Sequence, residues 1–200
     1  PNWKNSEVRL ERHIVAACAK RLDLWNQMPL ASGLLPLPDK DVKGKRRVSS
    51  EGRRAVDLIY RPEGANGPVE LLELKVLRPN GSRDSVRDAA LELLEYGVIY
   101  LFSRKYREEL GYNRSNRDDT YEVLGAPQIR LRVLAPPDYY VGQDIGSFSI
   151  DTTNCALKDY LQSNGLGNLT MDIGFEQLAK SDDAISQFVG KECWSGEKGN

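Results

Sequence analysis

The 200-residue chain carries 28 Lys/Arg and 29 Asp/Glu, which leaves a formal net charge of −1 at neutral pH. No apolar run approaches the about 20 residues that a membrane-crossing helix needs, so we expect no contact with a membrane. Three cysteines, Cys18, Cys155 and Cys193, are widely spaced and form no CxxC pair. This usage argues against a disulfide framework or a structural zinc site and predicts a cytoplasmic protein.

The charge is unevenly distributed along the chain. Residues 1–107 hold 20 Lys/Arg against 14 Asp/Glu, and residues 108–200 hold 8 against 15. A polyanion binds to local rather than net charge, so the basic half is a candidate surface for nucleic acid. An ordinary solvated surface explains the same counts.

The first predicted element is a helix from Ser6 to about Trp25. Steps of 100° per residue predict an apolar stripe on this helix, formed by Val8, Val15, Cys18 and Leu22. Glu11 falls inside the stripe, where a carboxylate is costly to bury unless it has a partner. A salt bridge accounts for it, and so does a functional role.

Three strands are predicted after a loop over residues 26–42. They cover residues 45–50, 55–61 and 69–77. The last two are joined by a linker that contains the strong turn pair Asn66-Gly67, which predicts a hairpin.

A second helix is predicted to begin near Ser82 or Asp84 and to end at Gly97. Residues 98–103, VIYLFS, then form an apolar run of the kind expected for a strand covered on both faces. Weaker patterns further along predict short or isolated elements: helices over residues 104–112, 155–165 and 175–190, and a strand over residues 128–136. The fold class is therefore α/β with a mixed sheet.

Ionisable residues stand in the middle of the two hairpin strands. Because side chains alternate along a strand, Glu73 and Lys75 share one face, about 7 Å apart. Normal hairpin pairing brings Asp57 to that face. Two carboxylates provide oxygen ligands for Mg²⁺ or Mn²⁺, and a nearby lysine can stabilise charge on a phosphoryl group. Exposed cross-strand ion pairs are the alternative interpretation, and they would stabilise the hairpin by about 1 kcal/mol or less.

The sequence Asp57, fifteen residues, then Glu73-Leu74-Lys75 resembles the signature of the PD-(D/E)xK nuclease superfamily. This resemblance implies a restriction-endonuclease-like core of helix, three strands, helix and strand. It covers residues 1–103 as a nuclease-like core, with residues 104–200 as a C-terminal extension packed on the same domain. Val56 stands where the family pattern has proline.

The resemblance also implies roles for individual residues. Asp57 and Glu73 would be metal ligands as well as catalytic residues, and Lys75 would be catalytic. Glu11 matches the acidic residue that many members place near the metal from their first helix, whereas Glu7 is a poorer candidate. One branch, the recombination-repair exonucleases, has glutamine and tyrosine four residues apart on the following helix. Here Glu92 and Tyr96 occupy that spacing, so the glutamine is absent.

A basic segment precedes the hairpin and is expected to contact phosphates. Its candidate nucleic-acid-binding residues are Lys43, Lys45, Arg46, Arg47, Arg53 and Arg54. The resulting expectation is a Mg²⁺- or Mn²⁺-dependent nuclease that acts on DNA in restriction, defence or repair, with a homodimer as one candidate assembly. The alternatives are a non-catalytic nucleic-acid-binding or assembly module of the same fold, and an unrelated α+β interaction protein.

Overall fold

The computed structural model describes most of the chain between residues 6 and 178. The described residues are 6–17, 24–28, 56–61, 67–78, 80–81, 83–110, 112, 123–144, 146 and 148–178. Side chains are described for all of these except residues 17 and 24–28.

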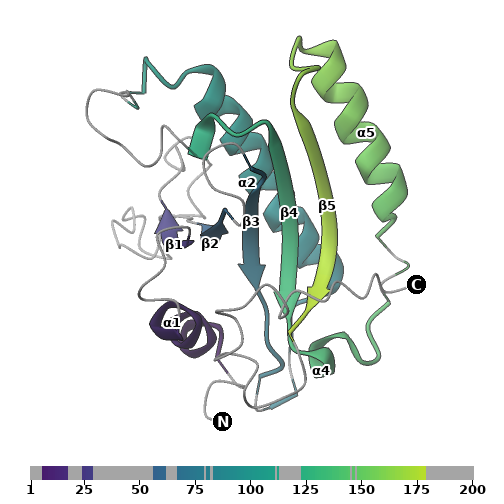
Figure 1. The fold of residues 1–200 in the computed structure, drawn as a ribbon. Helices are drawn as coiled ribbons and strands as arrows, with labels where there is room; N and C mark the ends of the chain where they lie inside the picture. Colours follow the sequence, from purple (N-terminus) through teal and green to yellow (C-terminus); the bar gives the residue numbers. More distant parts are fainter. Residues whose placement is uncertain are drawn as a thin grey trace, which may run out of the picture.

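One five-stranded mixed sheet organises the described part of the chain (Figure 1). Its strands are β1 (Leu24–Met28), β2 (Val56–Tyr60), β3 (Val69–Leu74), β4 (Gln128–Ala135) and β5 (Thr170–Gln177). They lie in the order β1-β2-β3-β4-β5. The first three strands pair antiparallel, and β3, β4 and β5 pair parallel. The chain is thus an α/β protein with a mixed open sheet, as the sequence predicts.

Four helices complete the described architecture. They are α1 (Glu7–Ala17), α2 (Val86–Lys105), the single-turn α4 (Pro137–Tyr140) and α5 (Ile150–Ser163). The helices α2 and α5 supply the crossovers that parallel neighbours require, from β3 to β4 and from β4 to β5. Up to β4 the elements with described bounds follow the order helix, three strands, helix, strand. None of the described helices is both long enough and apolar enough to cross a membrane.

The helix α2 is longer than its sequence pattern predicts. It continues through Gly97 to Lys105, so the predicted helix end at Gly97 and the predicted strand over residues 98–103 are both wrong. The glycine has a packing role instead, because a Cβ at Gly97 would lie 2.9 Å from Leu131 Cδ1 and 3.4 Å from Met171 Sδ. Glycine therefore lets the helix approach β4 and β5 closely. The predicted end of the nuclease-like core, residue 103, therefore lies inside α2 rather than at the end of an element.

Other predicted elements also differ from the structure. Residues 24–28 form β1, not the end of a helix and the start of a loop, and β1 is the strand that pairs with β2. Residues 175–177 belong to β5, so the predicted helix over residues 175–190 is wrong at its start. The predicted strand over residues 45–50 lies outside the described residues. The hairpin of β2 and β3, the strand β4 and the helix α5 are confirmed.

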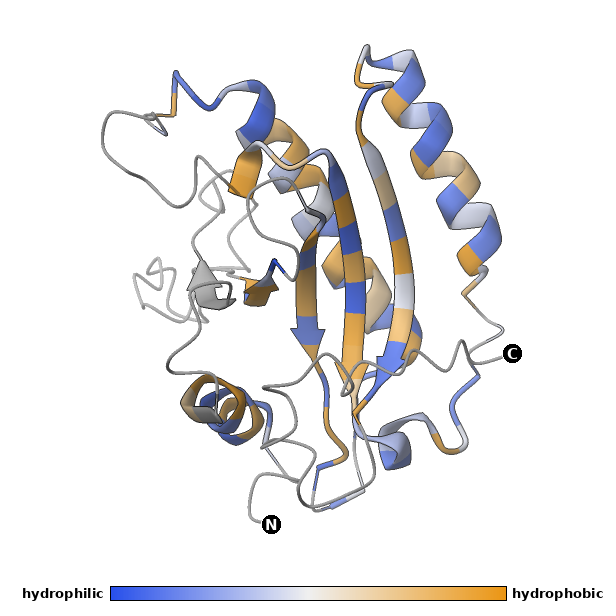
Figure 2. Ribbon diagram, viewed as in Figure 1, coloured by the Kyte–Doolittle hydropathy of each residue, from blue (hydrophilic) through white to orange (hydrophobic). Residues whose placement is uncertain are grey.

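The sheet separates two apolar clusters. On one face, α2 packs against alternate residues of the strands, including Leu71, Leu131 and Ile173. On the other face, Leu10 and Ile14 of α1 join a cluster that continues into the strands and the segments after them, with members Leu58, Tyr60, Leu72, Leu74, Val76, Leu134 and Leu178. Figure 2 shows the alternation of hydrophilic and hydrophobic residues along β4. The period of two in the sequence thus assigns each strand residue to a face.

The α1 side of the sheet also carries an ion-pair network. Arg132 contacts Asp172 and Glu176 on the neighbouring strand, and Arg130 lies 3.2 Å from Glu70 on β3. These pairs satisfy charges on a strand face that is partly withdrawn from water. They are separate from the acidic residues that the sequence singles out.

The helix α5 protects the outer edge of the sheet. The Asn154 amide donates to the Ile173 carbonyl oxygen at 3.2 Å, and its oxygen accepts from the Ile173 N–H at 2.8 Å. These two bonds satisfy backbone groups of β5 that point away from β4. An edge strand is thereby partly capped by a side chain.

The packing at Gly97 leads to a first prediction. The substitution Gly97→Leu is expected to destabilise the protein by about 1–3 kcal/mol, because the new side chain must enter a filled core. Leucine is a good helix former, so the loss cannot come from helix propensity. Urea unfolding measures it. The matched control is Val98→Leu on the same helix, where the side chain is 58% exposed and a change within about 0.5 kcal/mol is expected. Equal stability of the two variants would contradict this account of Gly97.

Candidate active site

Asp57 lies where the pairing between β2 and β3 ends. The last paired residues at this end are Leu58 and Leu72, so Asp57 and Glu73 occupy the next positions along the two strands. Instead of a further backbone bond, the Asp57 Oδ2 atom accepts from the Leu74 N–H at 2.9 Å. Its carboxylate therefore turns towards β3, as the sequence predicts.

Glu73 and Lys75 lie at the end of β3 on the face covered by α2. The Lys75 Nζ atom donates to Glu73 Oε1 at 2.7 Å, and only 5% and 6% of these two side chains are exposed. The other carboxylate oxygen, Glu73 Oε2, is buried and has no hydrogen-bond partner among the residues that the structure describes. The alternative of exposed cross-strand ion pairs is excluded, because Lys75 pairs with Glu73 of its own strand and both side chains are buried.

Glu92 of α2 contacts Lys75, although the sequence singles it out only as a secondary candidate, through its spacing from Tyr96. Its Oε2 atom accepts from Lys75 Nζ at 3.1 Å, and Asp84 Oδ2 lies 3.8 Å from the same nitrogen. The spacing between Glu92 and Tyr96 drew attention to this position, but no pattern in the sequence predicts its partner. Three carboxylates thus surround one ammonium group.

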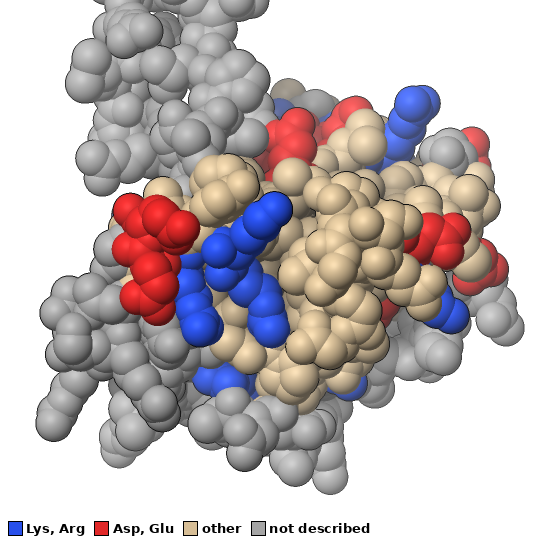
Figure 3. All heavy atoms as spheres, turned by 90° about the horizontal axis from the view of Figure 1, so that it is seen from above, with Lys and Arg blue, Asp and Glu red and all other residues tan. Residues whose placement is uncertain are grey.

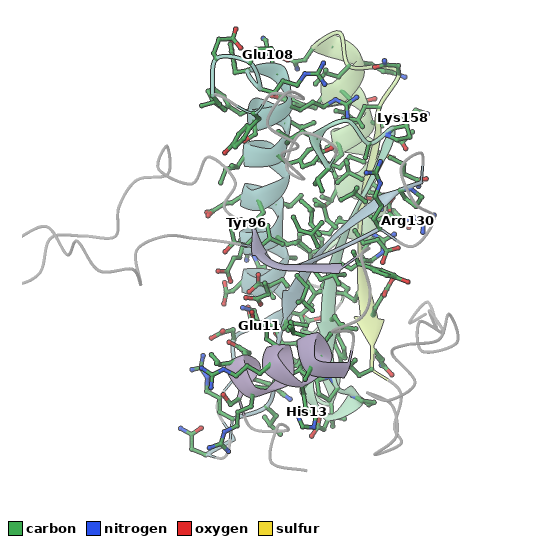
Figure 4. The ribbon with its side chains drawn as sticks, turned by 60° about the vertical axis from the view of Figure 1, so that its left-hand side comes forward. Glu11, His13, Tyr96, Glu108, Arg130 and Lys158 are labelled. Atoms are coloured by element: carbon green, nitrogen blue, oxygen red, sulfur yellow. The ribbon has the colours of Figure 1, made fainter. Side chains whose placement is uncertain are left out.

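Glu11 is confirmed as an inward-facing residue of α1, with 5% of the residue exposed. The predicted stripe is wrong in part, since Val8 is 51% exposed and the buried apolar positions are Leu10 and Ile14. Figure 4 shows Glu11 on the side of α1 towards the sheet and His13 on the opposite side. The charges of Glu11 and Glu7 both act on the Asp57 carboxylate, which places the first helix beside the site.

The first turn of α2 is anchored beside Lys75. Ser85 caps the helix by accepting from the Asp88 N–H at 3.0 Å, in place of the predicted Ser82 or Asp84. The Asp84 carbonyl oxygen accepts from the Tyr139 hydroxyl at 2.9 Å and from Gln143 Nε2 at 3.2 Å. Residues that follow β4 therefore fix the backbone that carries Asp84.

Burial raises the pKa values of both strand carboxylates, and the charges of neighbouring acids add to the effect. Burial raises the pKa of Asp57 to about 7, against the opposing effect of the Leu74 N–H bond. Burial and the Asp57 charge raise the pKa of Glu73 to about 9, although Lys75 acts in the other direction. A buried carboxyl with a raised pKa holds a proton more firmly than a surface acid does, and a bound cation would favour its ionised form.

Lys75 is affected in the opposite sense. Burial alone would lower its pKa, but the charge of Glu73 and the hydrogen bond from Lys75 to it raise the pKa above the ordinary value, with a further contribution from Glu92. The group is therefore an ammonium that donates hydrogen bonds. It does not accept a proton at neutral pH.

The donor set fits a divalent cation that keeps part of its water shell. Among the described residues, no three His, Cys, Asp or Glu side chains are grouped as a complete metal site. Mg²⁺ is commonly bound by only one or two carboxylates together with water and phosphate oxygens. The buried, unpartnered Glu73 Oε2 beside Asp57 meets that requirement.

The predicted nucleic-acid-binding segment falls outside the described residues. This applies to Lys43, Lys45, Arg46, Arg47, Arg53 and Arg54. At the end of the molecule away from α1, the last turn of α2 carries Arg104 and Lys105. Figure 3 shows Lys and Arg side chains at that end beside Asp and Glu side chains. This mixed surface lies far along α2 from Glu92.

Comparison with known proteins found no matching family model, no matching curated protein and no matching solved structure. The conclusions about this chain therefore rest on its own residues and their geometry.

The raised pKa values predict how stability depends on pH in a metal-free solution with a chelator. A carboxyl whose pKa is higher in the folded state contributes stability below its unfolded value, and this contribution is lost as pH rises through the folded value. For Glu73 the window runs from 4.5 to about 9. Stability should therefore fall across this window, with a slope of up to about 1.4 kcal/mol per pH unit for each proton released.

The variant Glu73→Gln keeps an oxygen that accepts from Lys75 and removes the titrating group. Its stability should fall less steeply with pH than that of the wild type, measured by urea unfolding at about pH 5, 7 and 9. The control Glu109→Gln changes an exposed carboxylate and should keep the wild-type slope. A wild-type slope in Glu73→Gln would show that this carboxyl does not have the raised pKa.

Proposed function

We propose that the protein is a divalent-metal-dependent nuclease that hydrolyses phosphodiester bonds, with DNA as its substrate. The observation that carries the proposal is the gathering of Asp57, Glu73 and Lys75 at the end of β3, with one oxygen of Glu73 buried and unpartnered. The element order up to β4 supports a restriction-endonuclease-like core and membership of the PD-(D/E)xK superfamily. In this interpretation the core extends past residue 103, because its last strand is β4.

Asp57 and Glu73 would hold Mg²⁺ or Mn²⁺, and Glu11 would support it directly or through water. Bound there, the ion supplies a Lewis acid for a phosphoryl oxygen and lowers the pKa of an attacking water. The Leu74 N–H bond fixes the orientation of the Asp57 carboxylate. Burial of Glu73 keeps competing water away from its oxygens and strengthens their attraction for a cation.

Lys75 is suited to stabilise charge on the phosphorus. An ammonium group has three donors, and the described hydrogen bonds of Lys75 use two, to Glu73 and Glu92. The third remains for a non-bridging phosphate oxygen or for the attacking water. A positioned donor at developing charge is typically worth about 10²-fold or more in rate.

Cleavage of supercoiled plasmid DNA tests the proposal directly. The wild type should nick or linearise the plasmid with Mg²⁺ or Mn²⁺ and not with a chelator. Lys75→Ala and Asp57→Asn should each lower the rate by about 10²-fold or more, because each removes a group that acts on the metal or the phosphate.

The matched control for the cleavage assay is Lys158→Ala, which removes an exposed lysine on α5. It should cleave like the wild type. Circular dichroism confirms that each variant is folded. Lys75→Met serves if Lys75→Ala is not folded, since its apolar chain fills the buried space. Equal rates in the wild type and a folded Lys75 variant would remove the assigned mechanism. DNA binding without any cleavage would favour the non-catalytic module.

Metal binding should also stabilise the fold independently of cleavage. A ligand at about 100 times its dissociation constant adds about 2.7 kcal/mol to the unfolding free energy. Urea unfolding with and without Mn²⁺ should show such a gain in the wild type and little gain in Asp57→Asn. The control Asp159→Asn, an exposed acid of α5, should retain it. A full gain in Asp57→Asn would place the metal elsewhere.

A further inference from the structure

Lys75 has two partners with different surroundings. Its Nζ atom lies 2.7 Å from Oε1 of Glu73 on β3 and 3.1 Å from Oε2 of Glu92 on α2. The Glu73 side chain is 6% exposed, whereas that of Glu92 is 37% exposed. Only the first partner belongs to the strand next to Asp57.

These two partners conflict if a cation binds at Asp57 and Glu73. The ammonium of Lys75 on Glu73 Oε1 and a cation on Oε2 then share one carboxylate, and the two positive charges repel each other. A lysine with Glu73 as its sole partner would have to stay on Oε1, because a buried ammonium without a partner is strongly disfavoured. Lys75 therefore needs a second anionic partner that is not shared with the cation.

Glu92 meets this need by its position in the fold. It lies on the second turn of α2, whose start is fixed by the Ser85 cap and by the contacts of Tyr139 and Gln143 with the Asp84 carbonyl. Asp84, at 3.8 Å, is beyond hydrogen-bonding distance and adds only its charge. Glu92 is thus the second carboxylate that forms a hydrogen bond with Lys75.

We propose that Glu92 is the positioning residue of Lys75: it keeps the ammonium at the phosphate side of the site, so that Glu73 can turn its oxygens to the divalent cation. This inference rests on the proposed function and assigns a role to a residue outside the Asp57, Glu73 and Lys75 set. Glu92 acts through Lys75 and not as a metal ligand. Its removal should therefore affect the site only while Lys75 is present.

A double-mutant cycle tests this role with Glu92→Gln, Lys75→Met and the double variant. Two quantities are measured for each protein: the dissociation constant for Mn²⁺ by titration, and the turnover number and KM for DNA cleavage. In the presence of Lys75, Glu92→Gln should weaken Mn²⁺ binding and lower the turnover number by about tenfold each, as is typical when the partner of a site residue is lost. KM should stay within about twofold, because Glu92 does not contact the substrate.

In the Lys75→Met background, Glu92→Gln should change Mn²⁺ affinity by less than about twofold. The control Glu109→Gln, an exposed acid just beyond the C-terminal end of α2, should match the wild type in every measurement. Unfolding free energies in a chelator complete the cycle. They should show non-additive losses for Glu92→Gln and Lys75→Met, as expected of two groups in contact.

The outcomes separate this inference from the proposed function. An active, Mn²⁺-binding wild type with additive effects of the two substitutions overturns the positioning role and leaves the nuclease. An effect of Glu92→Gln on Mn²⁺ affinity that persists in the Lys75→Met background would make Glu92 a metal ligand. This result also overturns the positioning role. A folded wild type that neither binds Mn²⁺ nor cleaves DNA overturns the proposed function, and the inference with it.

Discussion

Two carboxylates side by side on adjacent strands, Glu73 buried and Asp57 half-buried, are the constraint on which the rest of this site depends. In this arrangement the charge of Asp57 raises the free energy of ionising Glu73. A core built for stability alone would place apolar residues here, because unpaired buried charge is strongly unfavourable. The surrounding structure compensates in part, through the Leu74 N–H bond and the Lys75 ammonium. What remains uncompensated is one oxygen of Glu73.

The architecture explains how such a site can persist. Leu71 packs under α2 and Leu72 packs under α1, so the strand that carries Glu73 is buried on both faces. Neighbouring strands bond it on both sides, antiparallel on one and parallel on the other. A strand held in this way cannot rotate Glu73 into solvent without breaking both clusters. The packing around the strand therefore holds a carboxyl in surroundings that disfavour its ionised form.

Part of this arrangement was predictable from the sequence, and the reason is the period of two in a strand. The spacing of Glu73 and Lys75 places them on one face in any pairing, and a hairpin with the right register adds Asp57. The burial of Glu11 was also predictable, although its apolar neighbours were misassigned. These features depend on local geometry, which a sequence encodes directly.

Other features depend on tertiary contacts that no local pattern contains. The run of residues 98–103 is apolar on every side, and such a run suits a buried helix as well as a buried strand. Gly97 resembled a helix end, but the reason for glycine there is the nearness of Leu131. Glu92 contacts Lys75 because of the position along β3 at which α2 packs, and tertiary contacts set that position. The pairing of β1 with β2 likewise joins segments that are far apart in the chain.

The amide of Asn154 has a consequence for how the sheet can grow. By taking both the N–H and the C=O of Ile173, it imitates one residue of a neighbouring strand. An incoming extended peptide would have to displace this side chain, and the helix that carries it, before it could add to the outer rim of β5. The rim is therefore closed at its midpoint to strand addition, and a partner that approaches from this side must meet α5 first.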